Sequence, residues 1–207
     1  TTPLTTLTDT LEGAEKAIQE YLDEKRDVYF GVSKFITNQN RKAINAGWNK
    51  AFFLDLDCGL DKDYKNQAEA LDALKVFLKI TELPKPMVVN SGRGIHVYWP
   101  FNMDVPADVW RPTAENLKRL AKQHGFAIDP SVTADRARVL RVPGTHNYKK
   151  EKARPVTIVM EGATFDFEQF GASLKDKLNG HAYVPDEFGL GARPSFANAP
   201  SGVLSVI

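Results

Sequence analysis

The stretch Lys50–Gly59, with the sequence KAFFLDLDCG, constrains the fold of this chain more than any other part. Phe and Leu fill four of the five positions from 52 to 56, which favours a buried β-strand over a helix. Successive side chains of a strand point to opposite faces, so Asp55 and Asp57 share one face. Two such carboxylates repel each other unless a cation or a proton lies between them. The pair predicts either a divalent metal site, suited to Mg²⁺ or Mn²⁺, or the polar end of an ordinary core strand.

The rest of the composition describes an ordinary globular chain. Its 207 residues are 43% hydrophobic, enough for one sizeable domain, which we place at residues 1–178. Residues 179–207 are rich in Gly, Pro, Ser and Ala, and we expect a linker or a flexible tail there. The net charge of +1 means that any basic surface is local. The single cysteine, Cys58, excludes an intrachain disulfide and argues against a thiolate zinc site.

The sequence also gives no sign of a membrane segment or a secretory signal. It has no apolar run long enough to span a bilayer, so we predict a cytoplasmic protein without membrane contact. It has no GxxxxGK(S/T) motif either, so any helicase would be a separate protein or a fused part not included here.

Periodicity predicts a mixed α+β domain. Helical spacing of apolar residues and capping residues predict helices at about 10–25, 64–81, 107–124 and 165–178. Runs rich in β-branched and aromatic residues predict strands at about 27–36, 50–57, 87–90, 95–99, 136–142 and 155–160. The two strands at 87–90 and 95–99 flank a short Gly-containing connection and predict a hairpin.

A second cluster of polar residues lies in that connection, in the sequence Ser91-Gly-Arg93-Gly-Ile-His96. Its glycines let the backbone approach a phosphate closely. Ser91 offers a hydroxyl, Arg93 a forked cation, and His96 an imidazole that donates to phosphate oxygens. The alternative is a Gly-rich hairpin in which His96 packs against Tyr98, on the same strand face.

A third cluster follows between residues 129 and 150. Asp129 and Asp135 are both candidates for a third carboxylate. On the strand predicted at 136–142, Arg136 and Arg138 would share one face and Arg141 the other. The turn after this strand leads to Asn147, Lys149 and Lys150. A solvated basic face is the alternative to a phosphate site, and it applies least to Arg141, between Leu140 and Val142.

In combination these clusters resemble the archaeo-eukaryotic primase superfamily, specifically the primase-polymerases of phages and plasmids. Asp55-Leu-Asp57 is similar to the carboxylate pair of its first motif. The stretch from Ser91 to His96 is a longer version of the Ser-x-His second motif, and Ile128-Asp129 is similar to the third. The run from Arg138 to Lys149, RVLRVPGTHNYK, also looks like the phage and plasmid branch. The resemblance covers about residues 28–160.

The resemblance implies a fold, a chemistry and a set of partners. The fold is an α/β core with a mixed or antiparallel RRM-like sheet flanked by helices. Asp55, Asp57 and Asp129 would hold two Mg²⁺ or Mn²⁺ ions, and His96 would contact the nucleoside triphosphate. Further phosphate or template contacts would come from Arg93, Arg141 and Lys149, near the second and third motifs. Ser91 is a further nucleotide-binding candidate. The implied activity is template-directed DNA primer synthesis or extension on single-stranded DNA during phage or plasmid replication.

Two other functions stay open from the residues alone. A two-metal nuclease or phosphodiesterase needs the carboxylates but no triphosphate pocket. A non-catalytic module for single-stranded DNA would stack bases on aromatic residues such as Trp48 and Tyr148, but carboxylates facing DNA repel phosphate unless a metal screens them.

Overall fold

The computed structural model describes residues 4–150, 152–180 and 203–207. The helices in these residues are α1 (Leu11–Asp23), α2 (Gln67–Thr81), α3 (Ala107–Gln123), α4 (Phe167–Leu178) and the short 3-10 helix η1 (Ala43–Asn45). The strands are β1 (Thr6–Thr8), β2 (Tyr29–Gly31), β3 (Ser33–Phe35), β4 (Ala46–Asp57), β5 (Met87–Asn90), β6 (Gly94–Pro106), β7 (Val139–Arg141), β8 (His146–Asn147), β9 (Arg154–Pro155), β10 (Thr157–Met160) and β11 (Leu204–Val206). Within this described part, no helix is both long and apolar enough for a bilayer span.

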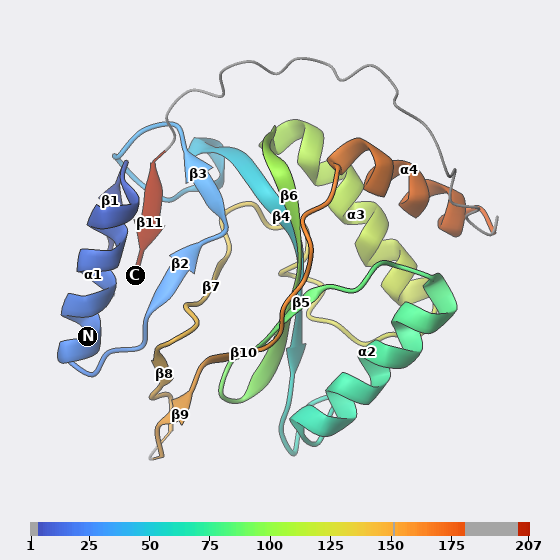
Figure 1. Cartoon of the computed structure of the whole chain (residues 1–207), viewed down its shortest axis with the longest axis horizontal. Helices are drawn as coiled ribbons and strands as arrows, with labels where there is room; N and C mark the ends of the chain where they lie inside the picture. Colours follow the sequence, from blue (N-terminus) through green and yellow to red (C-terminus); the bar gives the residue numbers. More distant parts are fainter. Residues whose placement is uncertain (1–3, 151, 181–202) are drawn as a thin grey trace.

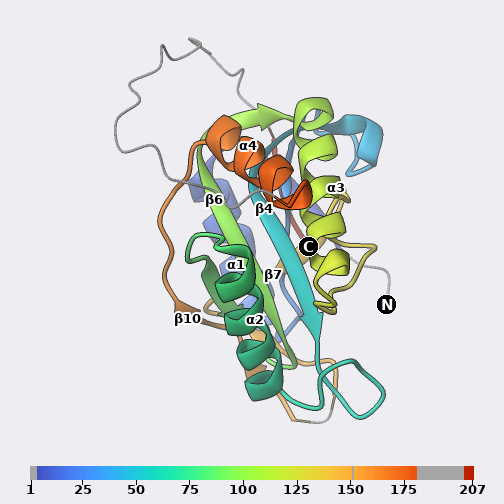
Figure 2. The same ribbon diagram turned by 90° about the vertical axis from the view of Figure 1, so that its right-hand side faces the viewer.

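The strands form two main antiparallel sheets. A five-stranded sheet has the order β10-β5-β6-β4-β3, and a four-stranded sheet has the order β1-β11-β2-β7. The helices α2, α3 and α4 lie on one side of the five-stranded sheet, and β2 and β7 lie on the other (Figures 1 and 2). The predicted α+β class with a sheet flanked by helices is therefore confirmed.

The long central strand β4 is held rigidly because its inner face is packed by aromatic rings from the helices. Phe52 is fully buried, 5.3 Å from the ring of Phe170 and 6.3 Å from the ring of Trp110. In α3, the buried residues Trp110, Ala114 and Leu117 recur at helical spacing, which explains why this segment folds as an amphipathic helix on the sheet. The opposite face of β4, which carries the two carboxylates, is therefore presented from a well-packed support.

Two strands expected from the sequence are broken or shortened in the structure. The single strand predicted at 27–36 is broken into β2 and β3, which belong to different sheets. The strand predicted at 136–142 is reduced to β7, and the preceding residues form turns. The prediction that Arg136 and Arg138 share a strand face is therefore wrong. The Ser33 hydroxyl donates to the Arg136 carbonyl oxygen at 2.5 Å, so tertiary contacts replace the strand pairing there.

The chain end also differs from the predicted tail. Most of residues 179–207 lie outside the described residues, but β11 pairs with β1 on one side and β2 on the other. Val206 is buried against Val28 and against Ala17 and Tyr21 of α1. The apolar sequence VLSVI explains this strand, because its alternating side chains reach an apolar layer beneath α1. The proposed domain boundary at 178 stays a prediction.

Candidate active site

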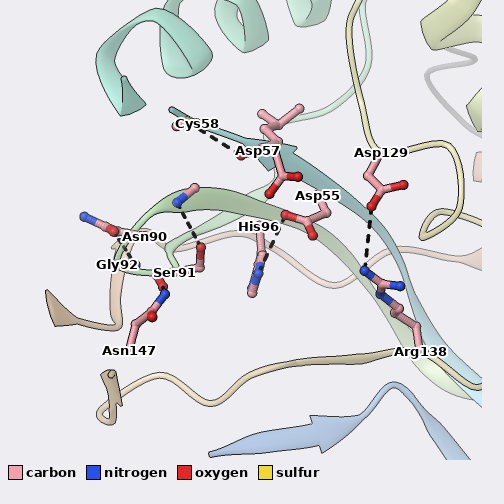
Figure 3. A network of polar contacts seen from close by, with 12 residues as sticks. Asp55, Asp57, Cys58, Asn90, Ser91, Gly92, His96, Asp129, Arg138 and Asn147 are labelled. Atoms are coloured by element: carbon pink, nitrogen blue, oxygen red, sulfur yellow. Dashed lines mark hydrogen bonds and ion pairs between the residues drawn. The ribbon is translucent and has the colours of Figure 1, made fainter. Parts of the chain in front are cut away.

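The register of β4 and β6 brings the carboxylate pair and the histidine to one place. Asp55 lies opposite His96, and Asp57 lies opposite Gly94. The Nε2 atom of His96 is 3.9 Å from an Oδ1 atom of Asp55 (Figure 3). The first and second clusters of the sequence therefore meet on the sheet face that looks away from the helices.

Asp129 reaches the same place from a loop. Its backbone amide donates to the Asp55 carbonyl oxygen at 2.9 Å, which fixes the loop against β4. Its carboxylate accepts from the Ser131 hydroxyl at 2.6 Å and lies 3.7 Å from the Arg138 guanidinium (Figure 3). Asp135 also faces the cleft, but its carboxylate caps the Ala137 amide. The Asp129 carboxylate acts on the pKa of Asp55, which favours it over Asp135 as the third acid of the cluster.

Asp55, Asp57 and Asp129 form an acid cluster, and its electrostatics favour a bound cation. Burial, followed by the negative charges of Asp57 and Asp129, raises the pKa of Asp55 from 3.8 to about 7. In Asp129, burial alone would raise the pKa, but hydrogen bonds from Ser131 and the charge of Arg138 lower it. The ammonium group of Lys62 lies 2.7 Å from a carboxylate oxygen of Asp57 and forms an ion pair with it. The cluster thus contains more negative charge than its burial tolerates without a compensating cation or proton.

The donor set fits Mg²⁺ or Mn²⁺, since it consists of carboxylate oxygens beside polar groups. Asp55, Asp57 and Asp129 would hold the ions. Among the described residues, however, no three acidic, histidine or cysteine side chains converge tightly enough to form a preassembled metal-ligand group. Lys62 and Arg138 instead compensate part of the negative charge. Binding of a metal would therefore require these side chains to move toward one another.

His96 is a buried, neutral donor. Burial, followed by the charges of Arg141 and Arg138, lowers the pKa of His96 to about 3. The Tyr98 hydroxyl lies 3.2 Å from Nδ1 of His96, which is its one hydrogen-bond partner within the described residues. Since a buried hydroxyl needs an acceptor, Tyr98 donates to Nδ1, and the ring proton sits on Nε2, facing the cleft. His96 therefore does contact Tyr98, as the hairpin alternative predicted, and this contact also fixes the orientation of the His96 ring.

The Ser91–Gly94 turn is built tightly around its glycines. The Ser91 hydroxyl accepts from the Gly94 amide at 3.1 Å, and the Asn147 side chain donates to the Ser91 carbonyl at 3.0 Å (Figure 3). Gly92 has a φ of +85°, a conformation that favours glycine. Arg93 donates to the Lys152 carbonyl oxygen at 3.0 Å, which aligns its guanidinium along the cleft wall. Ser91 thus shapes the turn as well as lining the cleft.

Gly94 is required by the close approach of β6 to β4. A Cβ added there would lie 2.6 Å from the Leu56 carbonyl oxygen. We expect Gly94→Ala to lower the free energy of unfolding by about 2 kcal/mol, because the backbone of one strand must move. Chemical denaturation measures this change. Gly125→Ala is the control, since no atom lies within 4 Å of its added Cβ and only its φ of +63° opposes the change. An unchanged free energy of unfolding in Gly94→Ala would contradict the close approach, whereas a loss in Gly125→Ala measures the effect of a positive φ alone.

The predicted cations line the cleft from the four-stranded sheet and the loop beyond it. Arg141 is buried, with its guanidinium 2.5 Å from an Asp27 carboxylate oxygen and 4.6 Å from the centre of the Tyr29 ring. The Lys149 amide donates to the Asn147 side chain at 3.1 Å, and the Asn147 amide group donates to the Ser91 carbonyl oxygen at 3.0 Å, which holds this loop near the Ser91 turn. Arg141 is therefore anchored firmly, whereas the Lys149 side chain is not fixed by a partner within the described residues.

These residues share one open cleft with a volume of about 750 Å³. All eight predicted site residues line it: Asp55, Asp57, Ser91, Arg93, His96, Asp129, Arg141 and Lys149. Four further cations line it that were not among the predicted site residues, namely Arg41, Lys62, Arg138 and Lys150. Arg138 stands in the quoted basic run, but Arg41 and Lys62 lie in loops without any periodic pattern. The sequence named Tyr98 only as a packing partner of His96 on the same strand face, not as a site residue.

Comparison with known proteins gives a structural likeness without a sequence match. No protein-family model matches the chain, and a search of curated proteins finds no match. The AEP domain of the cyanophage S-2L primase-polymerase matches with a TM-score of 0.56 and 20% identity, over 77% of this chain and 76% of that one. The polymerase domain of Mycobacterium tuberculosis Ligase D in complex with DNA gives a TM-score of 0.40 and 15% identity, over 75% and 61%. On the first match, the chain has an α+β fold similar to that of archaeo-eukaryotic primase-polymerase domains.

Proposed function

We propose that this protein is a metal-dependent nucleotidyltransferase that synthesises or extends DNA strands on a single-stranded DNA template. The observation that carries this proposal is the single cleft that three carboxylates share with a buried imidazole and several cations. The fold likeness to a cyanophage primase-polymerase domain supports it, and we propose the phage and plasmid branch of that superfamily as the origin of the chain. We place the catalytic unit in residues 1–178, with β11 completing the sheet that contains β2 and β7.

Each group would have a distinct task. Asp55, Asp57 and Asp129 would hold Mg²⁺ or Mn²⁺, which supply the charge that activates a 3′-hydroxyl and stabilises the leaving pyrophosphate. The Nε2–H group of His96 would donate to a phosphate oxygen of the incoming nucleotide. Because this imidazole stays neutral throughout the physiological range, its donor is present at every working pH.

The cations opposite the acids would bind the triphosphate. Arg93 in the Ser91–Gly94 turn and Lys149 in the loop after β8 both line the cleft, where their charges would attract phosphate oxygens. Arg141 is held by Asp27 and Tyr29, so its charge would act on the nucleotide from a fixed position. This constellation of cations favours a polymerase over a nuclease, because a nuclease needs no triphosphate pocket.

The decisive test offers the protein a primed or unprimed DNA template with nucleoside triphosphates and Mn²⁺ or Mg²⁺. We expect pyrophosphate release together with DNA products longer than the primer, or new primers. Cleavage of the strand without pyrophosphate release would instead establish the nuclease alternative. Tight DNA binding with neither reaction would favour a binding module. A crystal soaked with Mn²⁺ and a nucleoside triphosphate would then show whether Asp129 or Asp135 contacts the metal.

A further inference from the structure

A second groove lies beside the cleft, between α3 and the loop that follows Asp129. It has a volume of about 290 Å³, and we name it the α3 groove. Three cations line it, Arg111 and Lys118 of α3 and Arg136 of the loop, together with the acids Glu115 and Asp135. None of the residues that line it is aromatic.

The α3 groove is continuous with the cleft. Asp135 lines both. Two chain segments also pass from one to the other: Arg41 lines the cleft while Ala43 lines the groove, and Arg138 lines the cleft while Arg136 lines the groove. The Arg41 guanidinium donates to the Ala137 carbonyl oxygen at 2.5 Å, which ties the two segments together. Cations therefore follow one path from the carboxylates of the cleft to the side of α3 that borders the loop after Asp129.

The charges of this path are only partly compensated. Lys118 lies 3.7 Å from Glu115, a loose surface pair, and Asp135 is occupied by the Ala137 amide. In the described part of the chain, the guanidinium groups of Arg111 and Arg136 have neither a hydrogen bond nor an ion pair. Arg111 and Lys118 are seven residues apart and so share one face of α3, which buried Trp110 and Leu117 fix to the sheet. Forked, unpaired guanidinium groups are suited to phosphate oxygens, and Arg111 presents one from a packed helix.

We propose that the α3 groove binds the sugar-phosphate backbone of the single-stranded DNA template where the strand leaves the cleft. The assignment of this strand as a template rests on the proposed function. The absence of aromatic residues among those lining the groove means that bases have no stacking platform there, so binding would be independent of sequence. A path of spaced cations matches the repeating charge of a DNA strand better than it matches a single nucleotide.

The test measures the affinity of the full chain for oligodeoxythymidylate at several salt concentrations, without metal or nucleotide. In the Arg111→Gln/Arg136→Gln variant, we expect the affinity at low salt to fall about tenfold. The slope of log affinity against log salt should fall by about 1.4, since each phosphate contact on a single strand contributes about 0.7. The matched control is Lys16→Gln/Lys79→Gln, which removes the same two charges from exposed positions outside both the cleft and the groove.

The outcomes separate this proposal from the proposed function. An unchanged salt slope in the groove variant, or an equal fall in the control, would overturn the groove proposal. The Arg111→Gln/Arg136→Gln variant should keep Mn²⁺-dependent nucleotide binding, and the Asp57→Asn variant should keep the salt slope of DNA binding. These two results would support separate sites for nucleotide in the cleft and for DNA in the α3 groove. A chain that fails to polymerise but shows the expected slope change would contradict only the proposed function. If the double variant unfolds, the single variant Arg111→Gln replaces it, since Arg111 is exposed on α3. We expect this single variant to give half the change in the salt slope. An unchanged slope would contradict DNA binding in the α3 groove.

Discussion

The Asp57→Asn protein is expected to incorporate nucleotides about a thousandfold more slowly than the wild type. Asp57 ends β4 directly opposite Gly94, and its half-exposed carboxylate faces the cleft. An amide keeps the shape of the side chain but removes the charge that attracts a divalent cation. Loss of metal stabilisation worth about 4 kcal/mol in the transition state corresponds to about 10³ in rate. Single-turnover primer extension at saturating Mn²⁺ measures the effect.

Asp63→Asn is the matched control for this variant. Asp63 is an exposed acid in the loop after β4 but does not line the cleft. We expect its variant to keep the wild-type rate within about threefold, because a surface charge away from the reacting groups contributes little. Polymerisation by Asp57→Asn at the wild-type rate, or an equal loss in both variants, would exclude Asp57 as a metal ligand. A calorimetric titration with Mn²⁺ gives a second readout that does not depend on activity.

The Asp55→Asn protein is expected to be more stable than the wild type in the absence of metal at pH 8. Burial and the neighbouring acids raise the pKa of Asp55 from 3.8 to about 7 in the folded protein, so folding favours its protonated form. The contribution of Asp55 to stability is therefore fully present below about pH 4 and is lost as the pH rises through about 7. At about 1.4 kcal/mol per pKa unit, the loss amounts to about 4 kcal/mol at pH 8.

Urea unfolding from pH 4 to pH 8, with a chelator present, measures this difference. The stability difference between Asp55→Asn and the wild type should be smallest at pH 4 and grow towards pH 8. Added Mn²⁺ should stabilise the wild type at pH 8 but not the variant. Asp129→Asn is the control with the opposite sign, since the pKa of Asp129 is lowered and its contribution is lost as the pH falls. A stability difference between Asp55→Asn and the wild type that does not depend on pH would contradict a raised pKa of Asp55 in the folded protein.

The helices and the hairpin were predictable because they rest on local patterns. The apolar spacing in α3 and the Gly-containing turn between β5 and β6 both appear within a short window of sequence. Strands β2, β3 and β7 were predicted too long, because β-propensity in a window does not reveal where a chain changes sheets. Strand β11 was missed within a stretch dominated by small residues, since its pairing partners lie more than a hundred residues away in sequence.

The sequence by itself determined that Asp55 and Asp57 point the same way, because the side chains of a strand alternate with a period of two. It also placed His96 and Tyr98 on one face of their own strand. Only the tertiary structure decided that Asp55 faces His96, because strand register depends on packing and on the close approach at Gly94. It alone brought Arg41 and Lys62 to the cleft that Asp129 also lines, since these loop residues have no periodicity that a sequence pattern can reveal.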